Sequence, residues 1–473
     1  MPSTSPFPEP LPQPDVVVIG GGLAGCECAW QLAERGWRVA LREQKPHRRT
    51  PAQTSDHLAE LVCSNSLRSD NPQNAIGLLH EDLRLAGSLL LRLADAHRVP
   101  AGDALAVDRE QFAAAIADHI RRHPNIELIP GEVTELPLGL GVPIVVASGP
   151  LTSDALAAQI VALTGQERLA FFDAIAPIVA DESVDKEKVF AASRWGKGGG
   201  DDYLNCPLDK AQYTAFVEAL LAAEYLPLAE FEKGVHYFQG CQPIEVIARS
   251  GPKSLRFGPM KPTGLDDPRT GRWAYAVVQL RAENRHRTAW NLVGFQTKMK
   301  QADQRRVLGM IPGLEGAEFL RYGSVHRNTF LDSPRLLGVD MALKTQPNLH
   351  FAGQITGVEG YVESTASGLW VGLRLAAMLA GRALPLPPDT TAWGALLHHV
   401  LDPTAPQFQP SNVHWGMMPP LAEPVDGKRR NKGARKEAHL ERARAARSEW
   451  LAAASASGAL ATRSGRPVDN SCG

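Results

Sequence analysis

The sequence predicts an α/β fold, in which a domain with a parallel sheet is interrupted by an inserted mixed α+β domain. Two segments far apart in the chain predict the first domain, because each contains an apolar strand, a glycine turn and a helix: residues 15–43 and 349–379. Between them, from about residue 174 to residue 337, short strands alternate with prolines and glycine loops. This change of pattern predicts the insertion.

The N-terminal segment contains the parts of a Rossmann-like βαβ unit in order. Residues 16–19 are typical of a buried parallel strand, and residues 38–42 form a second strand that ends at Glu43. Between the strands, a G-x-G-x-x-G loop opens a helix and consists of Gly20, Gly21, Gly22, Leu23, Ala24 and Gly25. Bare backbone in such a loop approaches a pyrophosphate, and an acidic residue about twenty positions later binds a ribose diol. The segment therefore predicts a dinucleotide site.

Two later glycine turns predict that the dinucleotide is long. Residues 143–149 form a strand that ends at Gly149, before a helix over 156–163. Residues 349–357 form another strand and turn, with Gly353, Gln354 and Gly357, before a helix over 364–379. A cofactor longer than one mononucleotide needs contacts from both ends of the chain. The sequence therefore predicts a Rossmann-like FAD-binding domain built from residues 15–173 and 338–425, with residues 174–337 inserted.

Composition limits the class of protein. With 473 residues, 44% of them hydrophobic, the chain is long enough for two to four domains with buried cores. No apolar run reaches the length of a membrane helix, and the proline-rich arm, residues 1–14, lacks the pattern of a signal peptide. We therefore expect a flexible arm, a cytoplasmic location and no membrane contact. Cys26 and Cys28 lack metal-ligand spacing, so we expect them to be small core residues and expect no metal site.

A basic segment near the C-terminus is a candidate RNA contact. The net charge is −1, yet residues 427–447 carry nine Lys and Arg residues against Glu437 and Glu441. The candidate phosphate contacts are Lys428, Arg429, Arg430, Lys432 and Arg435. The alternative is a solvated basic helix over 426–450. Residues 451–473, rich in Ala, Ser and Gly, predict a disordered tail.

Cys63 and Cys241 are candidate reactive thiols. Each lies among polar residues and glycine, a setting that lowers a thiol pKa, whereas an isolated cysteine such as Cys206 is usually buried and inert. Cationic residues that could activate such a thiol are Arg249, Lys261 and Arg281.

Several strings in the chain carry a family resemblance. They include GGGLAG, ELVCSNSLRSD, SGPLTS, GCQPIE, NLVGFQTKM and FAGQITGVEGYVES. Together they resemble the folate- and FAD-dependent tRNA (uracil-5-)-methyltransferase family, often called TrmFO, from about residue 15 to residue 447. The chain departs from the family pattern in GGGLAG for GAGLAG, in SGP for TGP and in its extended tail. The first two changes keep the glycines.

The resemblance implies reductive methylation of the T-loop uridine of tRNA. It implies 5,10-methylenetetrahydrofolate as carbon donor, FAD as carrier and NADPH or NADH as reductant, with no obligatory protein partner. It also implies that Cys241 is the nucleophile that adds to uracil C6. Cys63 would be the second catalytic thiol, either the base that removes the C5 proton or a guard of a flavin adduct. The alternatives are a GidA-like wobble-uridine modifier that needs a GTPase, a ribosomal RNA methyltransferase and a non-catalytic RNA-binding flavoprotein.

Overall fold

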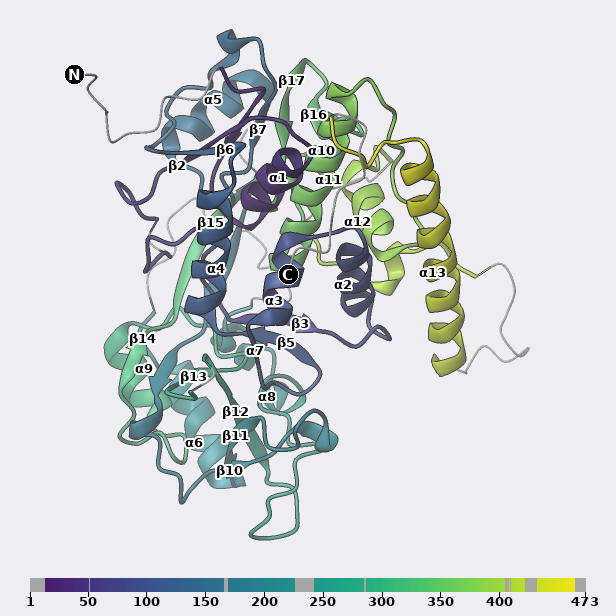
Figure 1. Cartoon of the computed structure of the whole chain (residues 1–473). Coiled ribbons are helices and arrows are strands. Elements are labelled where there is room, and N and C mark those ends of the chain that lie inside the picture. The colour runs from purple at the N-terminus through teal and green to yellow at the C-terminus, as the bar shows by residue number, and fades with distance from the viewer. Residues whose placement is uncertain are drawn as a thin grey trace, which may run out of the picture.

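The computed structural model, drawn in Figure 1, describes residues 13–50, 52–165, 169–225, 242–284, 286–404, 408, 410–421 and 432–463. Its first domain is built on a six-stranded sheet in the order β16-β17-β7-β1-β2-β6. All neighbours are parallel except β16 and β17. The strands are β1 (Val16–Ile19), β2 (Val39–Glu43), β6 (Ile126–Pro130), β7 (Ile144–Val146), β16 (Ala342–Leu343) and β17 (Gln346–Phe351). The predicted α/β fold with a parallel sheet is confirmed.

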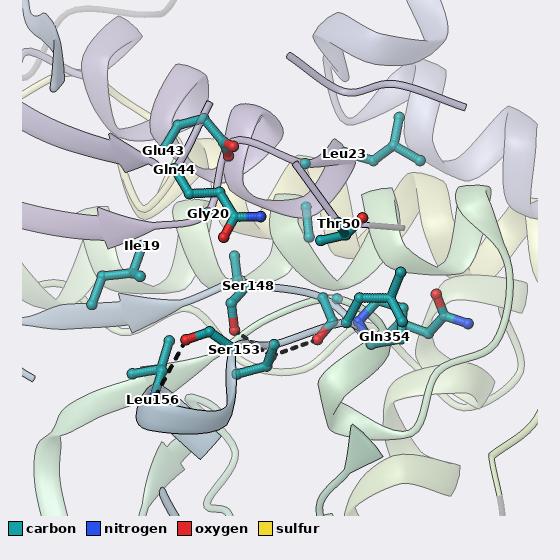
Figure 2. A pocket seen from close by; sticks show the side chains of 18 of the residues that line it. Ile19, Gly20, Leu23, Glu43, Gln44, Thr50, Ser148, Ser153, Leu156 and Gln354 are labelled. Carbon is teal, nitrogen blue, oxygen red and sulfur yellow. Dashed lines mark hydrogen bonds between the residues drawn. The ribbon is translucent and has the colours of Figure 1, made fainter. Parts of the chain in front are cut away.

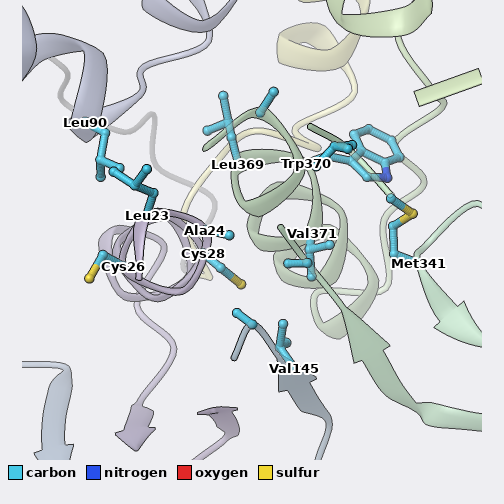
Figure 3. Close-up of a cluster of buried hydrophobic side chains, with 14 of the residues drawn as sticks. Leu23, Ala24, Cys26, Cys28, Leu90, Val145, Met341, Leu369, Trp370 and Val371 are labelled. Atoms are coloured by element: carbon cyan, nitrogen blue, oxygen red, sulfur yellow. The ribbon is translucent and has the colours of Figure 1, made fainter. Parts of the chain in front are cut away.

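Two helices from distant parts of the chain pack closely beside this sheet. They are α1 (Leu23–Glu34) and α11 (Tyr361–Leu379). A Cβ on Gly368 of α11 would stand 2.2 Å from the carbonyl oxygen of Ala24, so only glycine permits this approach. Cys26 and Cys28 are fully buried on α1, as predicted, and burial raises the pKa of both thiols (Figure 3).

Helix α11 begins at Tyr361, three residues before the predicted start. Its N-cap is Gly360, whose φ of 113° favours glycine and turns the chain into the helix early.

The other helices of the first domain surround a small antiparallel sheet and the main sheet. The small sheet contains β3 (Ser66–Ser69), β5 (Ala104–Val107) and β4 (Arg98–Val99), in that order. The helices are α2 (Ala75–Leu85), α3 (Leu89–Ala96), α4 (Arg109–Arg122), α5 (Asp154–Thr164), α10 (Ser333–Leu336) and α12 (Ala392–Leu401). Side-chain N-caps fix the starts of α3, α4 and α5, at Ser88, Asp108 and Ser153.

The insertion has its own sheet and its own core, which runs from Val179 to Leu314. The sheet order is β10-β11-β12-β13-β9-β14. Its strands are β9 (Ile178–Ala180), β10 (Phe190–Ala191), β11 (Tyr203–Leu208), β12 (Ala276–Ala282), β13 (Ala289–Leu292) and β14 (Phe319–Arg321). Its helices are α6 (Lys210–Leu221), α7 (Ile244–Arg249), α8 (Ser254–Phe257) and α9 (Gln301–Leu308).

A two-stranded antiparallel ribbon joins the insertion to the first domain. The ribbon consists of β8 (Leu169–Ile175) and β15 (Ser324–Phe330), with Ile175 opposite Ser324. The core of the first domain includes Leu331 and Leu337, so the insertion ends before the expected residue 337.

The C-terminal helix is longer than predicted. Helix α13 (Lys432–Ala456) extends past residue 450 because Trp450 and Ala454 are buried in the core of the first domain. The chain remains packed beyond the helix, where the N–H of Arg463 donates to the carbonyl of Arg35 at 2.7 Å. The expected disorder therefore does not extend to residues 451–463. Within the described ranges, none of the helices has the length and apolar character needed to cross a membrane.

Candidate functional site

A cleft opens where β1, β2, β7 and β17 reach their carboxyl ends (Figure 2). It encloses about 1070 Å³ of space not filled by atoms, including its open mouth. Ligands of open parallel sheets bind at this edge. The cleft brings together eight residues predicted from the sequence: Gly20, Gly22, Leu23, Ala24, Glu43, Gly149, Gly353 and Gln354.

The glycines of the first loop have different roles. Gly20 has φ +105°, and a Cβ there would stand 2.5 Å from the carbonyl oxygen of Ala147. A Cβ on Gly25 would stand 1.8 Å from the carbonyl oxygen of Gly20. These two glycines are needed for folding. Gly22 has an ordinary φ of −76°, and no atom of the described residues lies within 4 Å of the place where its Cβ would stand. The missing side chain of Gly22 therefore leaves room in the cleft itself.

The N-terminus of α1 faces this room. Gly22 is its N-cap and provides no capping side chain, so the N–H groups of the first turn are suited to an anion. Arg42 also lines the cleft, and its buried Nε has no hydrogen-bond partner among the described residues. Both features fit the pyrophosphate of a dinucleotide.

Glu43 links the loop to the end of β2. Its Oε2 accepts a hydrogen bond from the N–H of Gly21 at 2.6 Å, and its Oε1 accepts one from the N–H of Lys45 at 3.0 Å. A carboxylate has about four acceptor positions, so Glu43 retains capacity for a ribose hydroxyl. Gly21 thus contributes to the site through Glu43.

The other end of the cleft is formed by segments after β7 and β17. Thr152 donates to the carbonyl of Gly149 at 2.7 Å and also contacts the hydroxyl of Ser148 at 2.7 Å. Gln354 donates to Glu359 at 2.8 Å. The predicted Gly357 does not itself line the cleft. A Cβ at this position would stand 2.4 Å from the ring of Phe408.

Cys63 lies at the edge of the cleft, next to the lining residue Val62. Its Sγ is 2.8 Å from Oη of Tyr361, the first residue of α11, and Tyr361 also lines the cleft. Arg281, a buried residue of β12, donates to the side chains of Ser64 at 2.9 Å and Asn65 at 3.0 Å. The thiol therefore lies at the junction of the first domain and the insertion.

Of the three candidate activators, Arg281 interacts electrostatically with Cys63. Lys261 is exposed, and Arg249 stacks over the ring of Tyr225 at 5.4 Å. Cys206 is fully buried, and burial raises the pKa of its thiol. Cys241 lies outside the described residues.

Most of the candidate RNA contacts also lie outside the described residues, namely Lys428, Arg429 and Arg430. Lys432 begins α13, and Arg435 is exposed on it. Farther along the helix, Arg444 pairs with Glu81 and Arg447 with Asp82, both on α2.

Tyr361 is the residue that the sequence reasoning missed. It belongs to the string VEGYVES, but the string gave it no role. The signal that could have identified it is a tyrosine directly after a glycine, at the start of a helix beside a glycine turn.

Comparisons with known proteins agree with this geometry. The family model described as glucose inhibited division protein A matches residues 15–383. The "Methylenetetrahydrofolate--tRNA-(uracil-5-)-methyltransferase TrmFO" of Geobacter sulfurreducens is 58% identical over 437 residues, covering 92% of this chain and 99% of that protein. The protein of the same name from Anaeromyxobacter dehalogenans is 56% identical over 440 residues, covering 92% and 96%. The chain belongs to the TrmFO family.

The fold is also seen in a more distant protein. The structure of Aquifex aeolicus GidA matches with a TM-score of 0.66 at 15% identity, covering 96% of this chain and 75% of that chain. At this identity the likeness shows the fold alone. This TrmFO member therefore shares the α/β fold of that protein.

Proposed function

We infer that the protein methylates uracil C5 in tRNA, with methylenetetrahydrofolate as the carbon donor and FAD as cofactor. The observation that carries this conclusion is the 58% identity to a TrmFO protein over 437 residues. The match to the family model, over residues 15–383, spans the glycine loop, the Cys63 segment and the start of α11, which lie in or at the edge of the cleft. The protein is therefore an enzyme that acts on a folate and a tRNA.

The residues of the cleft fit FAD. We propose that the N-terminus of α1 and the space beside Gly22 hold the pyrophosphate, and that Glu43 binds the ribose of the adenosine. Gly149, Gly353 and Gln354 would line the site toward α11. When bound, FAD supplies the electron transfer that completes the methyl group. The contribution of the chain is to bind it and to exclude water around it.

We propose separate roles for the two thiols. The thiolate of Cys241 adds to C6 of uracil, which makes C5 nucleophilic toward the one-carbon unit. Cys63 then takes the proton from C5, and the C6–S bond breaks to release Cys241. The position of Cys63 at the edge of the cleft supports this role. Burial raises the pKa of the thiols of Cys26, Cys28 and Cys206, which makes these three residues poor candidates.

Several finer features remain proposals from the family resemblance. NADPH or NADH would reduce the FAD, and the T-loop uridine would be the methylated base. The cleft beside the glycine loop fits FAD, so NADPH or NADH would have to bind at a different place on the protein. We further propose that the protein works in the cytoplasm without an obligatory protein partner.

The carbon donor can be tested with the purified protein and an unmodified tRNA transcript. Label from the methylene group of 5,10-methylenetetrahydrofolate is expected to appear in 5-methyluridine, provided that NADPH or NADH is present. Mass spectrometry of nucleosides and of nuclease fragments would identify the product and its position. Labelled S-adenosylmethionine is expected to give no product. Transfer of its label without folate would contradict the assignment, and a product at the wobble position or only in ribosomal RNA would contradict the proposed substrate.

A further inference from the structure

One oxygen of Tyr361 contacts three atoms of the Cys63 segment. Its Oη lies 2.7 Å from the backbone nitrogen of Cys63, 3.3 Å from that of Ser64 and 2.8 Å from the Cys63 sulfur. A phenol oxygen accepts two hydrogen bonds and donates one. Backbone N–H groups can only donate, so these two occupy both accepting positions. The phenol hydrogen is left for the sulfur, which must accept it.

The charges around this pair favour a negative sulfur. Arg281 of β12 and Arg321 of β14 each interact electrostatically with Cys63, and Arg109 of α4 interacts with Tyr361. The nearby carboxylates are Glu60, which acts on Arg321, and Glu283, which pairs with Arg109 at 2.6 Å. In these interactions of the described residues, three guanidinium groups from three elements therefore face two carboxylates.

The phenol itself stays protonated. Burial raises the pKa of Tyr361 well above its usual value, and the neighbouring Cys63 raises it further. Tyr361 therefore carries its hydrogen at neutral pH and acts as a donor. Two other members of the cluster, Arg281 and Arg321, have pKa values lowered by burial, but an arginine at neutral pH still keeps its charge.

We propose that Tyr361 is a positioning residue that donates its O–H to the Cys63 sulfur and holds Cys63 as a thiolate at neutral pH. This inference rests on the proposed function, in which Cys63 accepts the C5 proton, because a thiolate is a base and a neutral thiol is not. The proton that Cys63 loses beforehand goes to solvent, and the phenol keeps its own. In turnover the C5 proton moves to the sulfur.

The ionisation of Cys63 can be measured by its alkylation with iodoacetamide as a function of pH. Trypsin releases it in the peptide of residues 50–68, which contains no other cysteine, so mass spectrometry reports this thiol alone. In Tyr361→Phe, with the FAD content of the preparations matched, we expect the alkylation profile to move to higher pH. At pH values below the pKa of Cys63 in both proteins, a shift of one pH unit makes alkylation about tenfold slower. Methylation by this variant is expected to fall at neutral pH and to recover as the pH rises.

A matched control and a second variant complete the test. Tyr203→Phe removes a hydroxyl from the same junction, where it donates to the carbonyl of Ala101 at 2.9 Å, and is expected to leave the profile unchanged. If Tyr361→Phe does not fold, 3-fluorotyrosine at position 361 keeps the geometry and strengthens the donor, so the profile is expected to move to lower pH.

The possible outcomes separate this inference from the proposed function. Profiles that coincide in the native protein and in the position-361 variants would overturn the inference, even if methylation is normal. The assay uses neither tRNA nor folate. A Tyr361-dependent thiolate in a protein that makes no methyluridine would instead overturn the proposed function.

Discussion

The backbone conformation at Gly22 does not require glycine, so its missing side chain indicates space for a ligand. Its φ suits any residue, and a Cβ there would touch no atom in the part of the chain that the structure describes. Gly20 and Gly25 differ, because a side chain at either position would collide with backbone. A single glycine motif therefore contains positions required by the fold and a position suited to a ligand.

This difference leads to a prediction for Gly22→Asp. The variant is expected to fold normally but to bind FAD roughly a hundredfold more weakly or worse, because placing like charges together costs several kcal/mol. The purified protein should be colourless, as measured by flavin absorbance and by its melting temperature. Gly139→Asp is the control, since Gly139 is exposed, has open space at its Cβ and lies outside the cleft. Stoichiometric FAD in purified Gly22→Asp would show that the glycine loop is not part of the FAD site.

A second prediction at the residue scale concerns the thiols of Cys241 and Cys63. Cys241→Ala should bind FAD and tRNA but make no methyluridine, and it should not be trapped by tRNA that contains 5-fluorouridine. Fluorine at C5 blocks the proton loss that releases the adduct, so the native enzyme is expected to be trapped. Cys63→Ala should lose turnover yet still form the covalent complex, because it stalls after nucleophilic attack.

The control for the thiols is Cys206→Ala, which removes a buried sulfur of the insertion and is expected to keep turnover. Denaturing gels would show the covalent complex as a shifted band. Trapping that persists in Cys241→Ala and disappears in Cys63→Ala would reverse the two roles, and full activity in both variants would reject thiol catalysis.

The sequence predicts Cys63 as a reactive thiol, but it does not predict the contact with Tyr361. The string around Cys63 is local, and its polar residues indicate reactivity. Tyr361 lies 298 positions away, and Arg281 meets Ser64 across 217 positions. The first contact depends on how two distant parts of the first domain pack, and the second depends on how the insertion docks on that domain. No local pattern in these segments encodes either arrangement.

At the scale of elements, α13 shows that the number of basic residues in a helix does not tell how many of them are available to contact RNA. The sequence predicted a basic helix, but charges in its second half are neutralised on α2. Arg444 contacts Glu81 at 3.0 and 2.6 Å, and Arg447 contacts Asp82 at 3.0 Å. If this segment contacts phosphates, its N-terminal part therefore makes the contacts. The strand–loop–helix unit from β1 to β2 was predictable because its apolar run and glycine spacing are local.

The basic segment leads to a prediction about the salt dependence of tRNA binding. If residues 428–435 touch phosphates, replacing Arg429, Arg430, Lys432 and Arg435 by glutamine should weaken tRNA binding. Each lost contact should reduce the log–log salt slope by about 0.7 to 0.9, as measured by binding titrations. Arg444→Gln is the control and should loosen α13 without changing the slope. An unchanged slope in the multiple variant would leave the segment as a solvated helix.

At the scale of the whole molecule, the two domains are held together beside the thiol. The amide of Asn65 donates to the carbonyl of Ala282 at 2.9 Å, and Asp202 accepts from the N–H of Gly102 at 2.6 Å. These contacts join the end of β12 and the residue before β11 to segments that flank strands of the small sheet of the first domain. The sequence indicated that an insertion exists, because its residue pattern changes, but could not indicate the face on which it docks.

Stability of the whole molecule is expected to fall in acid because of Asp70. Burial acts to raise the pKa of this carboxyl, but His80, Arg84 and Arg98 outweigh it and hold the pKa well below its usual value. A carboxyl with a lowered folded pKa stabilises the protein above its unfolded value of about 3.9, and this stability is lost as the pH falls toward the folded pKa. Asp70→Asn should therefore lower the melting temperature at pH 7.

Melting curves over a range of pH would check this expectation. The difference between the native protein and Asp70→Asn should be on the order of 1 kcal/mol at neutral pH and should shrink in acid. Asp118→Asn is the control, because Asp118 pairs with Arg122 on the surface, where both side chains are more than half exposed. A constant difference at all pH values would show that Asp70 does not contribute through its charge.

The ribbon of β8 and β15 makes the insertion modular. The chain leaves the first domain and returns to it through two strands that pair directly, with Ile175 opposite Ser324. A short hairpin turn between these positions would close the host chain without altering the order of its six-stranded sheet. Insertions with adjacent ends are the kind that host domains tolerate. An ancestral gene could have gained or exchanged this module in one recombination event, and a protein engineer could exchange it in the same way.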